Sequence, residues 1–349
     1  MSDVIVAPST RDLDELAGQL GEWLGGKLPA ASDIRIDNLT YPRGAGQSHE
    51  TILFDAHWSE GGEACEQGCV VRIKPSEFTV FVDTLFEEQY QVMKVISDGG
   101  YVKVAKPLWF EEDSSLLGQP FFVMEKREGR VPVSIPPYAR EGFMTELTPA
   151  QRRTLWENAV DQLAAIQHVP LDKLDFLKGP PGAEQGLEQE WDKYERGAAW
   201  VQEHVGSPAI GRALERLKSL WPANRPEGLV WGDARIGNMM FDEQQNVVCV
   251  MDWEQPSLGG ALHDLAWFVV LSDIMHGPNA QNGAYLEGMG SREETVARWE
   301  EKTGKSAADL DWYEDFTHFK MSCTGLRMGH WRGKQMMSEE VIAQRLKVA

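Results

Sequence analysis

The chain has 349 residues, enough for two lobes of moderate size, and its 42% hydrophobic and 25% charged residues are ordinary for a globular protein. Lys and Arg number 34 against 54 Asp and Glu, so the net charge is −20, which repels nucleic-acid phosphates and anionic lipid and argues against both as partners. The sequence has no secretory leader and no run of about 18 apolar residues, so we expect a cytoplasmic protein whose four cysteines are reduced thiols.

The first 125 or so residues predict a sheet with one packed helix. Apolar residues at helical spacing predict an opening helix over residues 11–28. Alternating apolar residues on both sides of a glycine-containing turn predict strand, loop and strand over 34–58, and a short strand follows at 68–75. An amphipathic helix over 82–97 and two strands joined by a polar turn over 106–129 complete this part.

After Gly129 helical periodicity dominates, interrupted by one apparent hairpin that ends at residue 251. The pattern therefore predicts an α+β chain of two lobes. The N-terminal lobe, residues 1–125, holds the opening helix, the glycine loop and a nucleotide-binding sheet. The larger α-helical lobe, residues 126–349, holds the hairpin and the helices that would bind an acceptor.

The hairpin brings together side chains that bind metals and protons. Residues 239–241 and 247–251 are strand-like around the turn DEQQN, so Asn238, before the first strand, should lie beside Asp252, after the second. An amide oxygen next to a carboxylate suits Mg²⁺, and Asp233, five residues upstream, could take a proton from a hydroxyl. Singly, these residues could be turn formers or a helix cap. Together, their spacing is typical of a kinase catalytic loop and its metal-binding Asp.

The N-terminal lobe offers candidate nucleotide contacts. The stretch RGAGQSHET at 43–51 could fold its backbone N–H groups over phosphates. The next strand carries two basic side chains, the helix after it offers an acid, and the strand between the lobes offers backbone groups for an adenine ring. Each feature could also be surface charge or an ordinary strand, and their order along the chain favours the nucleotide site. The candidates are Gly44, Gly46, Ser48, Arg72, Lys74, Glu88, Glu125 and Lys126.

Five motifs carry a resemblance to a known family: AGQSHETIL, VVRIKP, GQPFFVMEKREGR, WGDARIGNMMFD and VMDWEQPSLGGALHDLAW. Through them the chain resembles the aminoglycoside phosphotransferase family of the kinase-like superfamily, over roughly residues 33–330. It is most similar to the bacterial and acyl-CoA-dehydrogenase-associated branch of that family. The resemblance implies a bilobal protein-kinase-like fold, ATP with Mg²⁺ as cofactors, and phosphoryl transfer to a hydroxyl.

The resemblance also gives the candidate residues their roles. It implies Asp233 as the catalytic base, Asn238 and Asp252 as the Mg²⁺ ligands, Arg235 as a contact of the γ-phosphate, and Asp264 as a buried anchor of the catalytic loop. In the N-terminal lobe it favours Arg72 over Lys74 as the basic residue that contacts the nucleotide, which leaves the choice between the two open.

Two positions depart from the family pattern. Trp231 stands where the family has His before Gly-Asp, and Gln89 falls where a helix Glu is expected, with Glu88 adjacent. The His supports the loop and does not react, so an indole packed under the loop could replace it. The missing acid would weaken nucleotide positioning and keeps a second function in view, that of a non-catalytic nucleotide-binding regulatory protein.

The acceptor is the least determined part of the prediction. Acidic residues in the C-terminal helices could line a cationic site for an aminoglycoside-like amino sugar, or they could be solvated helix faces. The 13 Trp, several of them in those helices, could instead line a pocket for a hydroxylated metabolite or acyl compound. The sequence therefore predicts a small-molecule kinase whose partner is a hydroxyl acceptor of either class, and it leaves the oligomeric state open.

Overall fold

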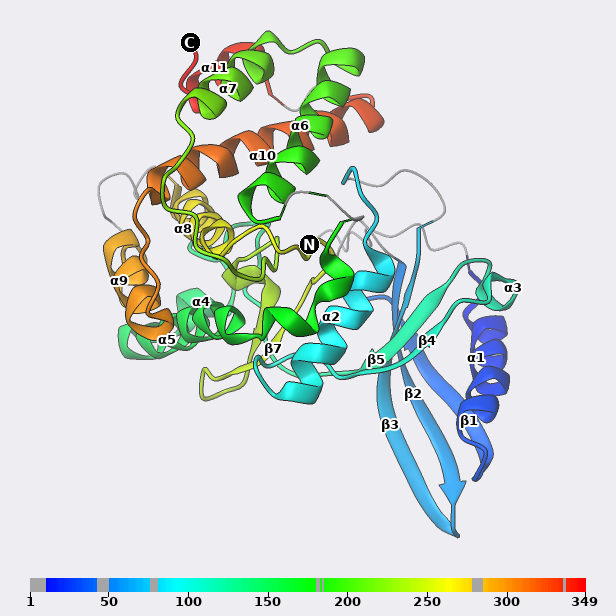
Figure 1. Cartoon of the computed structure of the whole chain (residues 1–349). Coiled ribbons are helices and arrows are strands. Elements are labelled where there is room, and N and C mark those ends of the chain that lie inside the picture. Colours follow the sequence, from blue (N-terminus) through cyan, green and yellow to red (C-terminus); the bar gives the residue numbers. More distant parts are fainter. Residues whose placement is uncertain are drawn as a thin grey trace. The chain divides into compact units, whose positions relative to one another are not determined.

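The computed structural model describes residues 11–42, 50–75, 81–179, 183, 185–277, 285–334 and 337–349. The chain divides into two compact units, Met1–Thr79 with Ala105–Arg127 and Val80–Val104 with Glu128–Ala349 (Figure 1). The predicted helix at 82–97 therefore groups with the second unit. The predicted lobe boundary between residues 125 and 126 stays a prediction.

The first unit is a five-stranded antiparallel sheet in the order β1-β2-β3-β5-β4. Helix α1 lies beside β1, as Figure 1 shows in blue, and a short helix separates β4 from β5. The predicted glycine loop between β1 and β2, with Gly44, Gly46 and Ser48, lies outside the described residues. The elements are α1 Leu13–Lys27, β1 Ala31–Thr40, β2 Glu50–Glu60, β3 Glu63–Ile73, β4 Pro107–Glu111, α3 Ser114–Leu117 and β5 Phe121–Glu125.

The core of the first unit lies between α1 and the sheet. Ile52, Phe54 and Ala56 alternate along β2 and are buried, as the two-residue period of a strand requires. They share one apolar cluster with Leu16 and Leu20 of α1. The predicted strands and opening helix are thus confirmed, because each buries the apolar positions that predicted it.

The second unit is mainly helical. Thr148 and Gln151 form a capping box that begins α5, and Ser291 with Glu294 does the same for α9. The helices are α2 Phe86–Gly99, α4 Phe143–Glu146, α5 Pro149–Ala165, α6 Leu187–His204, α7 Pro208–Ser219, α8 Leu262–His276, α9 Arg292–Thr303, α10 Leu310–Trp331 and α11 Glu339–Arg345. Single 3-10 turns occupy Ile166–His168, Leu171–Lys173, Asp175–Leu177 and Ile236–Asn238.

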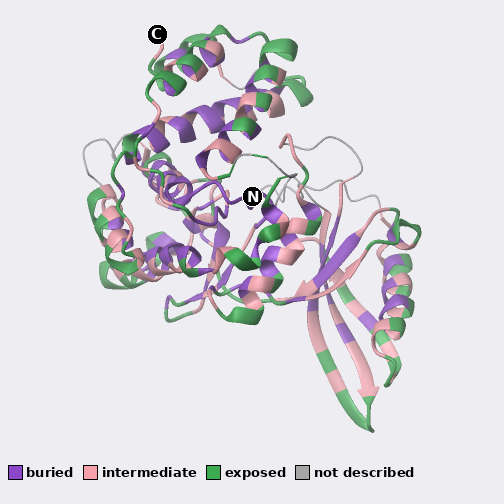
Figure 2. Ribbon diagram, in the orientation of Figure 1, coloured by how far each residue is buried: buried purple, intermediate pink, exposed green. Residues whose placement is uncertain are grey.

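Helices α8 and α10 form the centre of the second unit. Helix α8 is apolar on most of its faces, so it can be stable only when it is surrounded by protein. Figure 2 shows purple along much of both helices, and they pack directly on each other. Within the described residues, no helix combines the length and the apolar character that a bilayer crossing requires.

The predicted hairpin is present in this unit as β6 Met239–Phe241 and β7 Val247–Val250. Its outer edges are occupied by backbone from elsewhere in the second unit. Phe241 exchanges both backbone hydrogen bonds with Arg130, and the Val250 N–H donates to the Lys103 carbonyl at 2.6 Å. The short strand pair therefore has a fixed position from which its flanking loops extend.

Candidate active site

The hairpin register brings the two predicted metal ligands together along the backbone. Met239 pairs with Val250, and the Met251 N–H donates to the Asn238 carbonyl at 2.8 Å. Asn238 therefore lies directly across from the residue that precedes Asp252, as the sequence predicted. Asp252 adopts a left-handed backbone conformation with φ 64°, which is uncommon outside glycine but is tolerated by Asp and Asn.

The Asp233 carboxylate is held by three donors. Its Oδ1 accepts a hydrogen bond from the Trp267 indole Nε1 at 2.8 Å. Its Oδ2 accepts from the Asn238 side-chain nitrogen at 2.7 Å and from Arg235 Nε at 2.9 Å. The same Asn238 nitrogen also donates to the Asp233 carbonyl at 3.0 Å. The side chain is 27% exposed, so the carboxylate has a fixed orientation and still reaches solvent.

The buried Asp264 side chain holds the loop that carries Asp233 through hydrogen bonds to its backbone. This carboxylate accepts the backbone N–H of Trp231 at 2.6 Å and that of Gly232 at 2.9 Å. Burial raises the pKa of Asp264 to about 6, while the two N–H bonds lower it and so oppose that rise. Asp264 thus lies where the resemblance implied, as a buried carboxyl group that holds the loop.

Trp231 fastens the same loop to the hairpin. Its ring is fully buried, it packs against Trp253 with ring centroids 5.9 Å apart, and its indole Nε1 donates to the Met251 carbonyl at 2.8 Å. The loop before Asp233 is therefore tied to the end of β7, next to Asp252. An indole does the bracing at the position where the resemblance led us to expect a His.

Arg235 is positioned by side chains on both sides. Besides its bond to Asp233, its guanidinium donates to the Ser134 hydroxyl at 2.5 Å. Gly237 leaves room for this contact, because a Cβ there would lie 2.5 Å from Arg235 Nη1 and 2.7 Å from Ser134 Oγ. The Arg235 side chain is 25% exposed.

The donor atoms at the hairpin match a hard cation. Asn238 uses its side-chain nitrogen for both bonds to Asp233, which turns its amide oxygen away from that carboxylate. The described residues contain no group of three or more His, Cys, Asp or Glu suited to a metal. An amide oxygen and one carboxylate suit Mg²⁺, which keeps several waters and takes phosphate oxygens as further ligands.

The nucleotide candidates of the first unit lie on β3 and β5. Arg72 is buried on β3 opposite Phe122, and Lys74 follows the end of that strand. The Lys126 ammonium pairs with Asp55 at 2.5 Å. The backbone N–H groups of Glu125 and Lys126 donate within this unit, at 2.9 Å to the carbonyls of Lys106 and Gly68 respectively.

The predicted acid of the second unit lies on α2. Glu88 is half-buried, whereas Gln89 is fully buried, and neither polar atom of its amide has a hydrogen-bond partner among the described residues. The segment that leads into α2 is connected to α6 by a bidentate ion pair between Asp83 and Arg196, at 2.9 and 2.8 Å. Gln89 thus occupies a buried position that its polar amide does not suit.

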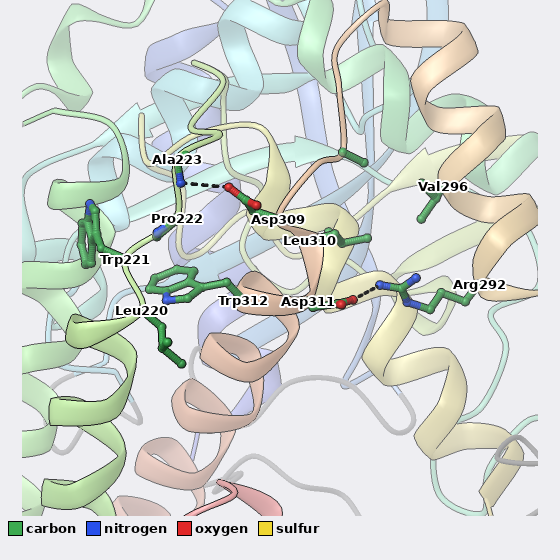
Figure 3. Close-up of a pocket in the computed structure, with 11 residues that line it drawn as sticks. Leu220, Trp221, Pro222, Ala223, Arg292, Val296, Asp309, Leu310, Asp311 and Trp312 are labelled. Atoms are coloured by element: carbon green, nitrogen blue, oxygen red, sulfur yellow. Dashed lines mark hydrogen bonds and ion pairs between the residues drawn. The ribbon is translucent and has the colours of Figure 1, made fainter.

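One hollow of the second unit lies away from the candidate active site. It encloses about 620 Å³ between the end of α7, α9 and the start of α10 (Figure 3). Its polar groups already pair with one another: Arg292 donates to Asp311 at 2.5 Å, and Asp309 accepts from the Ala223 N–H at 2.8 Å. Among the described residues, none of the side chains that surround Asp233 lines this hollow.

Two contacts of the site were missed in the sequence. Trp267 lies three residues after Asp264, which places both side chains on one face of α8, and that spacing could have indicated its role. Ser134 comes about a hundred residues before Arg235, and no local pattern links the two. Both residues belong to the second unit. Trp267 contacts Asp233 and Ser134 contacts Arg235, two residues that the sequence did identify.

Asp233, Asn238 and the end of β7 lie together around the hairpin. Comparisons with known proteins identify the family of the chain. The profile of the phosphotransferase enzyme family matches residues 45–301, and the chain belongs to this family. The predicted membership of the phosphotransferase family is thereby confirmed.

Curated relatives carry acyl-CoA dehydrogenase names. The chain is 28% identical to human acyl-CoA dehydrogenase family member 11 over 287 residues, which are 80% of this chain and 34% of that protein. It is 30% identical to the chicken protein of the same name over 228 residues, 64% of this chain and 26% of that one. The chain therefore spans about a third of the curated relatives it matches.

Solved structures confirm the fold. A putative aminoglycoside phosphotransferase from Ralstonia eutropha JMP134 superposes with a TM-score of 0.68 and 21% identity, covering 95% of this chain and 94% of that one. A thermostable aminoglycoside phosphotransferase APH(4)-Ia in complex with AMP-PNP and hygromycin B gives a TM-score of 0.53 with 14% identity, covering 94% and 97%. The predicted α+β, bilobal kinase-like fold is thus correct.

Proposed function

We propose that this chain is an ATP- and Mg²⁺-dependent kinase that transfers the γ-phosphate to a hydroxyl of a small molecule, with Asp233 as the catalytic base. The observation that carries the proposal is the Asp233 carboxylate, fixed by three donors at 2.7–2.9 Å and still 27% exposed. A carboxylate that is oriented and accessible can accept the proton of an incoming hydroxyl, which makes the hydroxyl oxygen a better nucleophile.

The residues around Asp233 divide the remaining tasks. Arg235 lies beside the base with its side chain partly exposed, where its guanidinium would neutralise charge on a transferring phosphoryl group. Asn238 and Asp252 would hold Mg²⁺, which would offset the negative charge of the phosphates. Asp264 and Trp231 keep the loop in place. Catalysis of this kind rests on positioning and charge neutralisation, for which a braced loop is the main requirement.

For nucleotide binding we propose the candidate residues that were identified from the sequence. We propose Gly44, Gly46 and Ser48 for the phosphates, Arg72 with Lys74 as second choice for the basic contact, and Glu88 for orienting it. Glu125 and Lys126 would meet the base through their carbonyls, since their N–H groups donate within the sheet. The AMP-PNP complex of the APH(4)-Ia structure supports a nucleotide as the phosphate donor.

For the acceptor we propose a hydroxylated acyl compound. The support is the set of curated relatives at 28% and 30% identity, which carry acyl-CoA dehydrogenase names. The structures that contain hygromycin B or kanamycin are only 14% and 13% identical to this chain. An amino sugar is the competing acceptor class, and it is distinguished by assay.

The proposal is tested by incubating the protein with ATP and Mg²⁺ and a panel of hydroxy acids, their thioesters and amino sugars, with product formation followed by ³¹P NMR. Replacing Asp233 with Ala should lower kcat by about 10²–10⁴-fold. Glu243→Ala, an exposed acid in the turn of the same hairpin, should leave kcat unchanged. Equal rates for the wild type and Asp233→Ala on every accepted substrate would remove the base assignment.

The alternative of a non-catalytic nucleotide-binding protein rests on Gln89, a buried amide where the resemblance led us to expect an acid. It predicts that ATP with Mg²⁺ stabilises the protein while no phosphate leaves ATP with any acceptor or with water. Turnover on any member of the panel excludes it.

A further inference from the structure

A buried lysine lies behind the residue that holds the proposed base. Lys320 on α10 is 2% exposed, and its ammonium lies 5.3 Å from the centroid of the Trp267 ring, whose indole N–H donates to Asp233 Oδ1 at 2.8 Å. Tyr194 and Phe316 present their rings to the same ammonium at 5.4 and 5.3 Å. The cation is therefore enclosed by aromatic faces, one of which belongs to a direct contact of Asp233.

Charge pairing alone does not explain this lysine. The nearest carboxylate, Glu190, is already satisfied by Lys193 at 2.9 Å and by the Ser257 hydroxyl at 2.7 Å, whereas Lys320 is 3.9 Å away. Burial disfavours the charged form of Glu190, but the two lysines and Ser257 outweigh it and lower its pKa to about 2. A second ammonium in this place costs desolvation that its longer ion pair only partly offsets.

Of the three donors to Asp233, Trp267 is the one to which the proposed chemistry gives no other role. Arg235 and Asn238, the other two donors, are assigned to the phosphate and to the metal. Only the indole N–H has no second task, so it has to orient the carboxylate while a nucleotide is bound. A cation over an indole ring draws electron density from it, which makes its N–H a stronger hydrogen-bond donor.

We propose that Lys320 is a positioning residue for phosphoryl transfer, which strengthens the hydrogen bond from Trp267 to Asp233 through the aromatic face it covers. The proposal rests on the assignment of Asp233 as the base. Burial lowers the pKa of Lys320 to about 8, so its ammonium is mainly protonated at neutral pH. Glu190, Lys193 and Tyr194 on α6 face Lys320, together with His263 and Asp264 on α8.

The test is a double-mutant cycle on kcat with ATP and Mg²⁺, using water or an accepted alcohol as the phosphate acceptor. Lys320→Met and Trp267→Phe should each lower kcat about tenfold, with the KM for ATP unchanged. The double variant should be no slower than the slower single variant, because both changes act on one hydrogen bond. Losses that multiply, or a full kcat in Lys320→Met, would overturn the proposal.

Two controls separate positioning from folding. Lys218→Met removes an exposed lysine, 68% exposed, from α7 and should leave kcat unchanged. Urea unfolding shows whether each variant is folded, and Lys320→Gln, which can still donate to Glu190, replaces Lys320→Met in the cycle if the Met variant does not fold. Lys320→Arg, which keeps the charge, should recover most of the lost kcat, whereas an Arg variant as slow as the neutral one would count against the proposal.

A spectroscopic measurement keeps this inference separate from the proposed function. In a ¹H–¹⁵N spectrum, the indole N–H resonance of Trp267 is assigned as the resonance that is lost in Trp267→Phe. It should move to lower frequency in Asp233→Ala and in Lys320→Met, and stay in place in Lys218→Met. A resonance that Lys320→Met leaves in place disproves the link even in an active enzyme. A protein without turnover that shows both shifts would retain the link and lose the kinase proposal.

Discussion

Trp231 shows how a single residue braces the loop before Asp233 in the place where a His was expected. The ring is fully buried, its backbone N–H donates to Asp264, and its indole N–H donates to the Met251 carbonyl. A His side chain is smaller than an indole and would not fill the same volume against Trp253.

Replacing Trp231 with Phe tests this bracing. The change keeps an aromatic ring but leaves the Met251 carbonyl without its donor, so we expect the free energy of unfolding to fall by about 1–3 kcal/mol. The proposed kcat should fall about tenfold, because the end of β7 next to Asp252 is no longer tied to the loop. Urea unfolding and the ATP assay measure the two effects.

Trp331→Phe is the matched control, since Trp331 is 54% exposed on the same unit and its replacement should change stability by less than about 0.5 kcal/mol. Equal stability of the two variants would mean that the indole of Trp231 does not brace the loop.

Single residues were predictable where their neighbours in sequence determine their place. Asn238 and Asp252 flank one hairpin, so its register brought them together, and Asp264 was identified by its motif. Ser134 and Lys320 were not predictable, because each reaches the site through packing of segments about 50 to 100 residues apart. The period of a helix or strand determines which face is buried but not which neighbour covers it.

Among the elements, α1 shows how a helix outside the catalytic unit is attached to its sheet. Trp23 and Lys27 both reach Glu111 on β4, at 2.9 and 3.0 Å. The Trp23 hydrogen bond and the Lys27 ion pair lower the pKa of Glu111 to about 2, while partial burial opposes them. The folded state thus binds the proton of this carboxyl more weakly than the unfolded chain does, and Glu111 stabilises the fold when it is ionised.

Glu111→Gln should therefore destabilise the protein by about 1–2 kcal/mol at pH 7, a value reduced for the 18% exposure of the side chain. Because the pKa is depressed in the folded state, the stabilisation is complete above the ordinary value of 4.5 and is lost as pH falls towards about 2. Urea unfolding from pH 7 downwards should show the wild type and Glu111→Gln converging over that range. Glu112→Gln, an exposed neighbour, serves as the control, and a gap that stays constant with pH would contradict the assignment.

Within each unit, the positions of the helices and strands could be predicted from the sequence. The opening helix, the sheet strands and the hairpin all lie where their periodicity placed them, because each buries one face in a local core. The helix predicted at 82–97 formed as α2, but its grouping with the second unit depends on contacts such as Asp83 with Arg196, which no local pattern encodes.

For the whole molecule, the central question is whether ligand binding is linked to the metal site on the hairpin. A ligand that binds only the folded state stabilises it, by about 2.7 kcal/mol at a concentration of 100 Kd. AMP-PNP cannot be turned over, so its effect reports binding alone. With a net charge of −20, the chain has to overcome repulsion to bind a polyphosphate, and a divalent cation at Asp252 would offset that repulsion.

We therefore expect AMP-PNP to raise the melting temperature much more with Mg²⁺ than with EDTA, and Asp252→Asn to remove the Mg²⁺-dependent part alone. Asn tolerates the left-handed backbone at this position, so the variant loses charge without straining the loop. Glu243→Gln, on the turn of the same hairpin, should behave as the wild type does. If AMP-PNP raised the melting temperature of the wild type equally with and without Mg²⁺, the metal site would be contradicted. A Mg²⁺ ion bound at Asp252 should strengthen nucleotide binding and so increase that shift.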